Sequence, residues 1–196
     1  MAQDAGRPEF WEERYRNGVT PWDAGGAPAA FCAWLAKERA PLSVLVPGCG
    51  SGYEVRALAE QGHDVLAIDF SEAAVEAARR QAHGLRARIR HEDFFQLSEP
   101  PVEVLYERTF MCALPPRMRA AWAEHVQALV RPGGRLLGFF FFDAQPKGPP
   151  FGIAPSALHA LLDPGFALLV DEPVPAAQSV PVLAGKERWQ VWQRRL

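Results

Sequence analysis

Three glycines on alternate positions follow a run of branched apolar residues in the segment LSVLVPGCGSG, residues 42–52. The apolar run predicts a strand that is buried on both faces. Gly48, Gly50 and Gly52 predict a turn that approaches a ligand closely, because glycine has no side chain and readily adopts positive φ angles. In an open α/β sheet, ligands bind beyond the carboxyl ends of the strands, where such a turn lets backbone amides reach them.

Asp69 ends the next apolar segment, HDVLAID, at the ~20-residue separation from the turn that a nucleoside site requires. A carboxylate at that place accepts hydrogen bonds from ribose hydroxyls. A dinucleotide-binding chain carries GxGxxG, whereas this chain has GxGxG with the bulky Tyr53 where the third glycine would stand. The pattern therefore favours S-adenosylmethionine. The alternative is that the glycines only make a tight turn and that Asp69 only caps the following helix.

The segment HEDFF follows the third predicted strand and offers contacts for an adenine ring. Asp93 can accept a hydrogen bond from the adenine amine, while Phe94 or Phe95 covers the face of the ring. The competing interpretation is that the phenylalanines only pack in the core, as apolar residues usually do.

Strand and helix patterns alternate along the chain and place these residues at the ends of strands. Ser71 is predicted to cap a helix, Gly62 to end one in the left-handed conformation, and RPGG to stop a helix before a central strand. Strands are predicted at residues 42–46, 63–69, 86–90, 103–108, 135–143, 166–170 and 187–193, and helices at 53–61, 72–82, 115–129 and 155–162. The series predicts an α/β fold, doubly wound, with a mostly parallel seven-stranded sheet and an antiparallel edge strand.

Length and composition indicate one domain without nucleic-acid or membrane partners. The chain has 196 residues, of which 48% are hydrophobic, so we expect a single domain over residues 1–196. Its 21 basic and 23 acidic residues are dispersed and give a net charge of −2, which argues against nucleic-acid binding. No apolar run is long enough to span a bilayer, so we expect a cytoplasmic protein. Three cysteines without CxxC spacing and five scattered histidines indicate neither a disulfide framework nor a metal site. We expect a monomer that acts on a small-molecule substrate.

Seven stretches of the chain resemble, in order, the thiopurine and thiol methyltransferase family, whose members are class I S-adenosylmethionine-dependent enzymes. The stretches span about residues 10–166 and read FWEERYRNGVTPWD, VPGCGSGYEV, DFS, EDFF, YERTFMCALPP, RPGG and KGPPFG. GxGxG and RPGG occur in many methyltransferases, whereas GxTPWD joined to VPGCG is specific. Pro47 stands where many other methyltransferases carry an acid, and this departure is itself the pattern of the family. The resemblance implies a Rossmann-like methyltransferase fold.

The resemblance also implies roles for individual residues. Trp11 is expected against the cofactor and Trp22 near the acceptor, within an N-terminal helical segment, residues 1–40, that closes over the site. Arg108 is expected at the cofactor and acceptor side of the pocket, and Arg108 and Trp22 are our predicted catalytic residues. The predicted cofactor-binding residues are Trp11, Trp22, Gly48, Cys49, Gly50, Gly52, Asp69, Phe70, Asp93, Phe94, Phe95 and Arg108.

Each of these roles has a structural alternative. The two tryptophans can be a staple that packs the N-terminal helix on the sheet. Arg108 can form a purely structural ion pair with Glu107 or another carboxylate. KGPPFG, which follows the fifth predicted strand, can be a stiff rim at the acceptor entrance or an ordinary surface turn.

The motifs leave the methyl acceptor open. Members of the family methylate thiopurines and other aromatic thiols, and related enzymes methylate small thiols, halide, thiocyanate, or tellurium and selenium species. ERTF keeps an arginine as in the thiopurine branch, whereas VPGCG and GPPF look more like the halide and thiol branch. Such soft nucleophiles need no strong general base, and we assign no catalytic role to His91, the histidine nearest a matched motif.

Our first hypothesis is an S-adenosylmethionine-dependent S-methyltransferase that acts on a small soft nucleophile. A non-catalytic sensor that binds S-adenosylmethionine or its product is the second hypothesis, and turnover with any acceptor distinguishes the two. A nicotinamide-dependent oxidoreductase is the third, and calorimetry with S-adenosylmethionine against the dinucleotides tests it.

Overall fold

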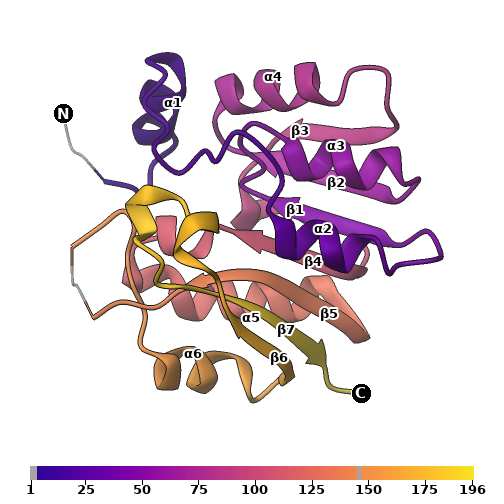
Figure 1. The fold of residues 1–196 in the computed structure, drawn as a ribbon, viewed down its shortest axis with the longest axis vertical. Coiled ribbons are helices and arrows are strands. Elements are labelled where there is room, and N and C mark those ends of the chain that lie inside the picture. Colours follow the sequence, from indigo (N-terminus) through magenta and orange to yellow (C-terminus); the bar gives the residue numbers. More distant parts are fainter. Residues whose placement is uncertain (1–3, 145–146) are drawn as a thin grey trace. The chain divides into compact units, whose positions relative to one another are not determined.

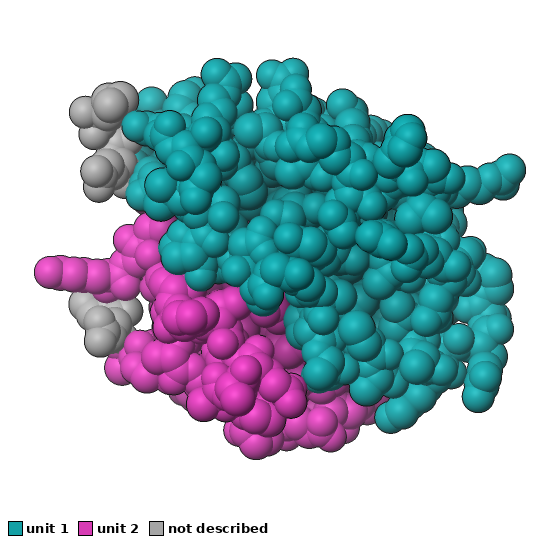
Figure 2. Space-filling view, turned by 45° about the horizontal axis from the view of Figure 1, so that its top comes forward, with its two compact units in different colours: residues 1–97 teal, residues 98–196 magenta. Residues whose placement is uncertain are grey.

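The computed structural model describes residues 4–144 and 147–196, which fall into two compact units. The first unit comprises residues 1–97 and the second residues 98–196, coloured separately in Figure 2. The prediction that residues 1–196 make one domain stays a prediction. No helix in the two described stretches is long and apolar enough to cross a membrane.

The first unit contains three parallel strands, in which β1 pairs with β2 and β2 with β3 (Figure 1). Its elements are α1 (Pro8–Arg16), α2 (Ala29–Leu35), β1 (Ser43–Pro47), α3 (Tyr53–Glu60), β2 (Asp64–Asp69), α4 (Glu72–Gln81), β3 (Ala87–His91) and a 3-10 turn at Phe94–Gln96. The core of this unit contains the buried residues of β1 and β2 and the apolar faces of α3 and α4, which pack against β2 and β3.

Local signals in this unit act as predicted. Gly62 adopts a φ of +82° directly after α3. Ser71 caps α4, since its Oγ accepts a hydrogen bond of 3.2 Å from the Ala74 amide. Gly52, with a φ of +80°, begins α3 so close to α4 that a Cβ there would lie 2.7 Å from the Cα of Ala78. Gly52 therefore permits the close helix packing that the third glycine of GxGxxG provides in dinucleotide-binding chains.

The second unit contains four strands, of which β4 and β5 are parallel and β7 is antiparallel to both of its neighbours, β5 and β6. Its helices and strands are β4 (Val102–Arg108), α5 (Arg119–Leu129), β5 (Val130–Phe141), α6 (Pro155–Leu162), β6 (Phe166–Pro173) and β7 (Glu187–Arg194). Short 3-10 turns lie at Met111–Ala113, Pro116–Met118, Ala176–Gln178 and Pro181–Leu183. Trp122 of α5 and Trp192 of β7 are the largest of its fully buried side chains.

The prediction that RPGG separates a helix from a strand is wrong in one respect. Strand β5 begins at Val130 and includes RPGG, directly after α5. The strand register with β4 passes from Val102–Val130 to Val104–Arg135, so the additional residues form a bulge. Gly133, with a φ of +75°, gives the backbone the freedom to leave and rejoin the ladder.

The strand order is β3-β2-β1-β4-β5-β7-β6, which confirms the predicted fold class, a mostly parallel seven-stranded α/β sheet. The antiparallel strand is β7, and it lies one place in from the edge, which is formed by β6.

Candidate active site

Asp69 ends β2 and is 6% exposed. Its Oδ2 accepts a hydrogen bond of 3.1 Å from the Gly50 amide, and its Oδ1 accepts one of 2.9 Å from the Ser71 amide. Burial raises the pKa of this carboxyl to about 6, although both amide bonds favour the ionised form. Asp69 therefore connects the glycine turn to the segment that follows β2. This goes beyond the alternative that Asp69 only caps the following helix. Because a carboxylate accepts about four hydrogen bonds, it retains capacity for ribose hydroxyls.

The glycine turn has the conformation that its sequence predicts. Gly48, Gly50 and Gly52 have φ angles of +58°, +52° and +80°. A Cβ at Gly50 would lie 2.8 Å from the phenolic oxygen of Tyr15, so the close approach that this glycine allows is to a side chain of the N-terminal segment. Cys49 is buried between the glycines, and desolvation raises the pKa of its thiol, which agrees with a structural role.

Trp11 and Trp22 belong to one aromatic cluster. Their rings meet edge-on with centroids 5.2 Å apart, and Trp22 meets Tyr15 at 5.8 Å in the same way. The Trp22 indole donates a hydrogen bond of 3.2 Å to the Tyr15 hydroxyl, and the Trp11 indole donates one of 2.8 Å to the carbonyl of Ala5. All of these contacts lie within the N-terminal segment, so both predicted roles of the two tryptophans, a staple on the sheet and contact with a cofactor or acceptor, stay predictions.

Tyr15 was not among the residues predicted from the sequence. It is half-buried, and desolvation together with the charge of Asp69 raises the pKa of its phenol. The sequence does indicate a position for Tyr15 near the site, because Tyr15 follows Trp11 by four residues and so lies on the same helix face.

Two carboxylates of the N-terminal segment contact serines of the loops around Asp69. Asp23 accepts a hydrogen bond from the Ser51 hydroxyl in the glycine turn, and Glu12 accepts one of 2.7 Å from the Ser71 hydroxyl. Burial raises the pKa of Glu12, but its hydrogen bonds and Arg16 lower it more, so the carboxylate is ionised near neutral pH. These partners are 28 and 59 residues apart, and no local sequence pattern indicates either contact.

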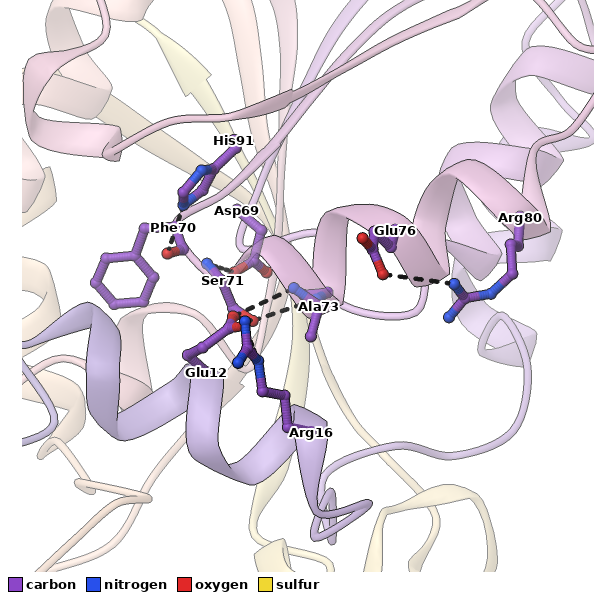
Figure 3. Close-up of polar contacts among 10 residues, drawn as sticks. Glu12, Arg16, Asp69, Phe70, Ser71, Ala73, Glu76, Arg80 and His91 are labelled. Atoms are coloured by element: carbon purple, nitrogen blue, oxygen red, sulfur yellow. Dashed lines mark hydrogen bonds and ion pairs between the residues drawn. The ribbon is translucent and has the colours of Figure 1, made fainter.

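The residues predicted around adenine lie at the carboxyl ends of β2 and β3. Phe94 is buried and Phe95 half-buried, with ring centroids 5.3 Å apart, so Phe94 is a core residue. Asp93 is exposed and accepts a hydrogen bond of 2.9 Å from the Phe95 amide through one oxygen. The carbonyl of Phe70 lies 3.1 Å from Nε2 of His91 (Figure 3).

Arg108 ends β4 in the second unit and is half-buried. Its guanidinium carbon lies 4.6 Å from the ring centroid of Phe139, its partner in the neighbouring strand β5. The carboxylate of Glu107 accepts hydrogen bonds from the amides of Phe110 and Met111. Thr109, the next residue after Arg108, has a φ of +55°.

The KGPPFG segment, residues 147–152, is fastened within the second unit. The Arg119 guanidinium donates hydrogen bonds of 3.1 and 2.7 Å to the carbonyls of Phe151 and Gly152. The Phe151 amide donates one of 2.6 Å to the carbonyl of Cys112. These contacts hold the end of the segment, and its predicted role as a rim at the acceptor entrance stays a prediction. Across the described ranges, no group of three or more histidine, cysteine, aspartate or glutamate side chains is arranged to hold a metal ion.

The fold is similar to that of solved methyltransferases. The structure of 1,6-didemethyltoxoflavin-N1-methyltransferase from Burkholderia thailandensis, with bound 1,6-didemethyltoxoflavin and S-adenosylhomocysteine, matches with a TM-score of 0.76. The match covers 96% of this chain and 87% of that one at 21% sequence identity, which shows a shared fold. The protein thus has the class I methyltransferase fold.

Sequence comparison defines the family. A family model described as thiopurine S-methyltransferase matches residues 6–195. Thiocyanate methyltransferase 1 of Brassica oleracea is 32% identical over 193 residues, which cover 94% of this chain and 84% of that protein. Thiopurine S-methyltransferase of Pseudomonas fluorescens is 33% identical over 187 residues, with 84% and 86% covered. The chain belongs to the thiopurine S-methyltransferase family.

Membership of this family confirms the predicted enzyme class, an S-adenosylmethionine-dependent S-methyltransferase, and with it the predicted methyl donor. It excludes the nicotinamide-dependent oxidoreductase, the third of the hypotheses drawn from the sequence.

Proposed function

We propose that this protein transfers the methyl group of S-adenosylmethionine to a small, soft, anionic nucleophile such as a thiolate, thiocyanate or a halide. The observation that carries the proposal is the buried carboxylate of Asp69, which holds the amides of Gly50 and Ser71 around the end of β2. A buried carboxylate in that position suits a nucleoside whose ribose hydroxyls complete its hydrogen bonding.

The first unit offers the residues for the donor. Asp69 accepts hydrogen bonds from the ribose, and the backbone of Gly48, Cys49 and Gly50 lies along the methionine part. Phe70, Asp93, Phe94 and Phe95 surround the adenine, with Phe95 the more exposed of the two adjacent rings. Gly52 serves mainly the packing of α3 on α4. Trp11 and Trp22 cover the site from the N-terminal segment.

Arg108 of the second unit serves the acceptor. Its guanidinium is a fixed cation with a planar fork of donors, and the adjacent ring of Phe139 holds the plane in place. A cation beside an aromatic face suits a large, polarisable anion better than a neutral alcohol or amine. Similarity to a thiocyanate methyltransferase and to a thiopurine S-methyltransferase supports a sulfur nucleophile.

The reaction places few demands on the protein. The donor supplies a methyl group on a positively charged sulfur, which leaves with the electron pair of the broken carbon–sulfur bond. The residues of the site need only hold the acceptor atom ~3 Å from the methyl carbon, in line with that bond, and exclude water. A soft anion needs no deprotonation, and the site accordingly uses no histidine as a base.

A methyl-transfer screen tests the proposal. The purified chain is incubated with S-adenosylmethionine and, separately, thiocyanate, hydrogen sulfide, iodide, aromatic thiols, thiopurines and tellurite, and formation of S-adenosylhomocysteine is measured. Turnover with an anionic sulfur or halide acceptor supports the proposal. Tight binding of the donor with no turnover across the set would favour the non-catalytic sensor instead. The cytoplasmic location and the monomeric state stay predictions, and light scattering of the purified chain tests the latter.

A further inference from the structure

Glu12 of α1 reaches the start of α4, as Figure 3 shows. Its Oε2 accepts two hydrogen bonds, one of 2.7 Å from the Ser71 hydroxyl and one of 3.2 Å from the Ala73 amide. Its Oε1 pairs with Arg16, one helical turn further along α1. The side chain is 22% exposed, so most of its surface is withdrawn from water. Glu12 is thus a charged, hydrogen-bonded connection between two helices.

Ser71 connects this contact to the predicted ribose-binding carboxylate. Its amide donates to Asp69, and its hydroxyl donates to Glu12 while accepting from the Ala74 amide. Ser71 is fully buried, so each of these groups must be satisfied within the protein. Any movement of α1 away from α4 leaves the Ser71 hydroxyl without an acceptor, directly beside Asp69.

Helix α1 depends on such contacts for its existence. It has 9 residues, whereas isolated helices shorter than ~12–15 residues are only marginally stable in water. The helix also has no side-chain cap at its N-terminus. The position of α1 beside the loop after β2 therefore depends on the residues that α1 contacts. Glu12 provides a polar contact between α1 and the start of α4.

The other end of the segment is fastened in the same way. Asp23 accepts a hydrogen bond from Ser51 in the glycine turn. The N-terminal segment thus joins the two loops around Asp69 through one carboxylate–serine contact at each, and the Tyr15 hydroxyl lies close to Gly50 in the glycine turn.

We propose that Glu12 is a positioning residue, whose hydrogen bonds to Ser71 and Ala73 hold α1 on the loop after β2 and thereby hold the donor site in its binding shape. The proposal rests on the proposed function for the identity of the donor. Glu12 itself touches neither the donor nor the acceptor in this assignment, and acts through Ser71 on Asp69.

Three variants of the full chain separate this role from others. Glu12→Ala removes both hydrogen bonds, and Glu12→Gln removes the charge but keeps an oxygen that can accept them. Glu13→Ala is the matched control, because Glu13 is the adjacent glutamate of the same helix and is exposed. Hydrogen–deuterium exchange of the α1 amides reports whether the helix is held, and calorimetry with S-adenosylmethionine reports the state of the donor site.

Glu12→Ala is expected to speed exchange in α1 and to weaken donor binding, each about tenfold, which corresponds to about 1.4 kcal/mol. Glu12→Gln should stay within about threefold of the parent in both measurements, and Glu13→Ala within about twofold. In a Ser71→Ala background, Glu12→Ala should change donor affinity less than it does alone, because the main contact is already absent.

Equal effects of Glu12→Ala and Glu13→Ala on α1 exchange would overturn the proposal, whatever the donor affinity. A Glu12→Gln variant as impaired as Glu12→Ala would also overturn it, since charge and the Arg16 pair would then carry the effect. Failure of the proposed function gives a different result: the parent chain forms no S-adenosylhomocysteine with any acceptor, while the exchange experiment still decides the role of Glu12.

Discussion

Asp69 in the first unit and Glu107 in the second are both buried carboxylates near the carboxyl end of a parallel strand, and both accept hydrogen bonds from backbone amides. The amides differ in origin. Glu107 binds the amides of Phe110 and Met111, three and four residues further along the chain. Asp69 binds Ser71 two residues away, but also Gly50, 19 residues before it.

Glu107 thus stabilises only a local turn, whereas Asp69 connects two segments that are distant in sequence. Glu107 fixes the turn that follows Arg108. Asp69 holds two separate loops, and the N-terminal segment is fastened to both of these loops by further carboxylates. On the donor side the proposed site therefore depends on contacts between distant residues, whereas the amides that Glu107 holds belong to the turn directly after it.

The largest effect expected from this comparison is on the pH dependence of stability. Burial raises the pKa of Glu107 to about 8 and that of Asp69 to about 6, from ordinary values of 4.5 and 3.8. A folded state with a raised carboxyl pKa binds the proton more tightly than the unfolded chain, so this stabilisation is present at low pH and lost as pH rises through the folded value. At 1.36 kcal/mol per pH unit, the loss is up to about 5 kcal/mol for Glu107 and about 3 kcal/mol for Asp69.

Urea unfolding of the parent, Glu107→Gln and Asp69→Asn from pH 4 to pH 9 measures both contributions. Glu107→Gln should remove the contribution of Glu107 to the decline in unfolding free energy, which extends to about pH 8. Asp69→Asn should remove the contribution of Asp69, which ends near pH 6. Curves that stay parallel to the parent throughout would show that neither carboxyl is protonated more readily in the folded state.

The sequence predicts those features of the molecule that depend on neighbouring residues. All seven strands, the cap at Ser71 and the left-handed Gly62 follow from local patterns, and so does Asp69, because the length of a βαβ unit fixes its separation from the turn. The bulge at RPGG does not, since Pro-Gly-Gly signals a turn and a bulge alike.

The contacts that complete the donor side could not be predicted in this way. Glu12 with Ser71 and Tyr15 with Gly50 join residues far apart in sequence, and their side chains are ordinary for an exposed helix. The roles of the predicted site residues toward donor and acceptor stay predictions, because those roles depend on a bound molecule as well as on the fold.

The second prediction concerns the donor side directly. Asp69→Ala should weaken binding of S-adenosylmethionine and of S-adenosylhomocysteine by about 1 to 3 kcal/mol, the usual contribution of a charge-assisted hydrogen bond. Asp64→Ala is the matched control, because Asp64 begins the same strand and is exposed. Calorimetry that gives equal affinities for the two variants would remove Asp69 from the ribose site.

The third prediction concerns the acceptor side. Arg108→Ala should lower kcat/KM at least about 10-fold, or about 1.4 kcal/mol, and Arg108→Lys should keep part of the activity because the charge remains. Donor affinity should change little. Arg131→Ala is the control, since Arg131 is an exposed arginine of β5 that pairs with Glu103. An Arg108→Ala enzyme that methylates a thiolate at the parent rate would leave the second unit without an assigned role in binding the acceptor.

The smallest expected effect lies beside Arg108, at Thr109. A β-branched residue is strained at a φ of +55°, and the left-handed region costs a non-glycine residue about 1 to 2 kcal/mol. Thr109→Gly removes this strain but adds freedom to the unfolded chain, so we expect a net stabilisation of at most about 1 kcal/mol. Ala184, with a φ of +50° in another loop of the second unit, gives the matched variant Ala184→Gly. Both variants should raise the unfolding free energy in urea by similar amounts.

Activity then separates the two positions. The Thr109 hydroxyl donates a hydrogen bond of 2.7 Å to the carbonyl of Arg108, so glycine there loosens the backbone that carries the guanidinium. Thr109→Gly should therefore lower kcat/KM about two- to threefold, less than 1 kcal/mol, while Ala184→Gly leaves it unchanged. Strain that persists beside a functional residue is expected where the surrounding structure holds that residue in place. If Thr109→Gly gains stability and keeps full activity, the left-handed turn serves the fold alone, and Arg108 is positioned by Phe139 and the strand.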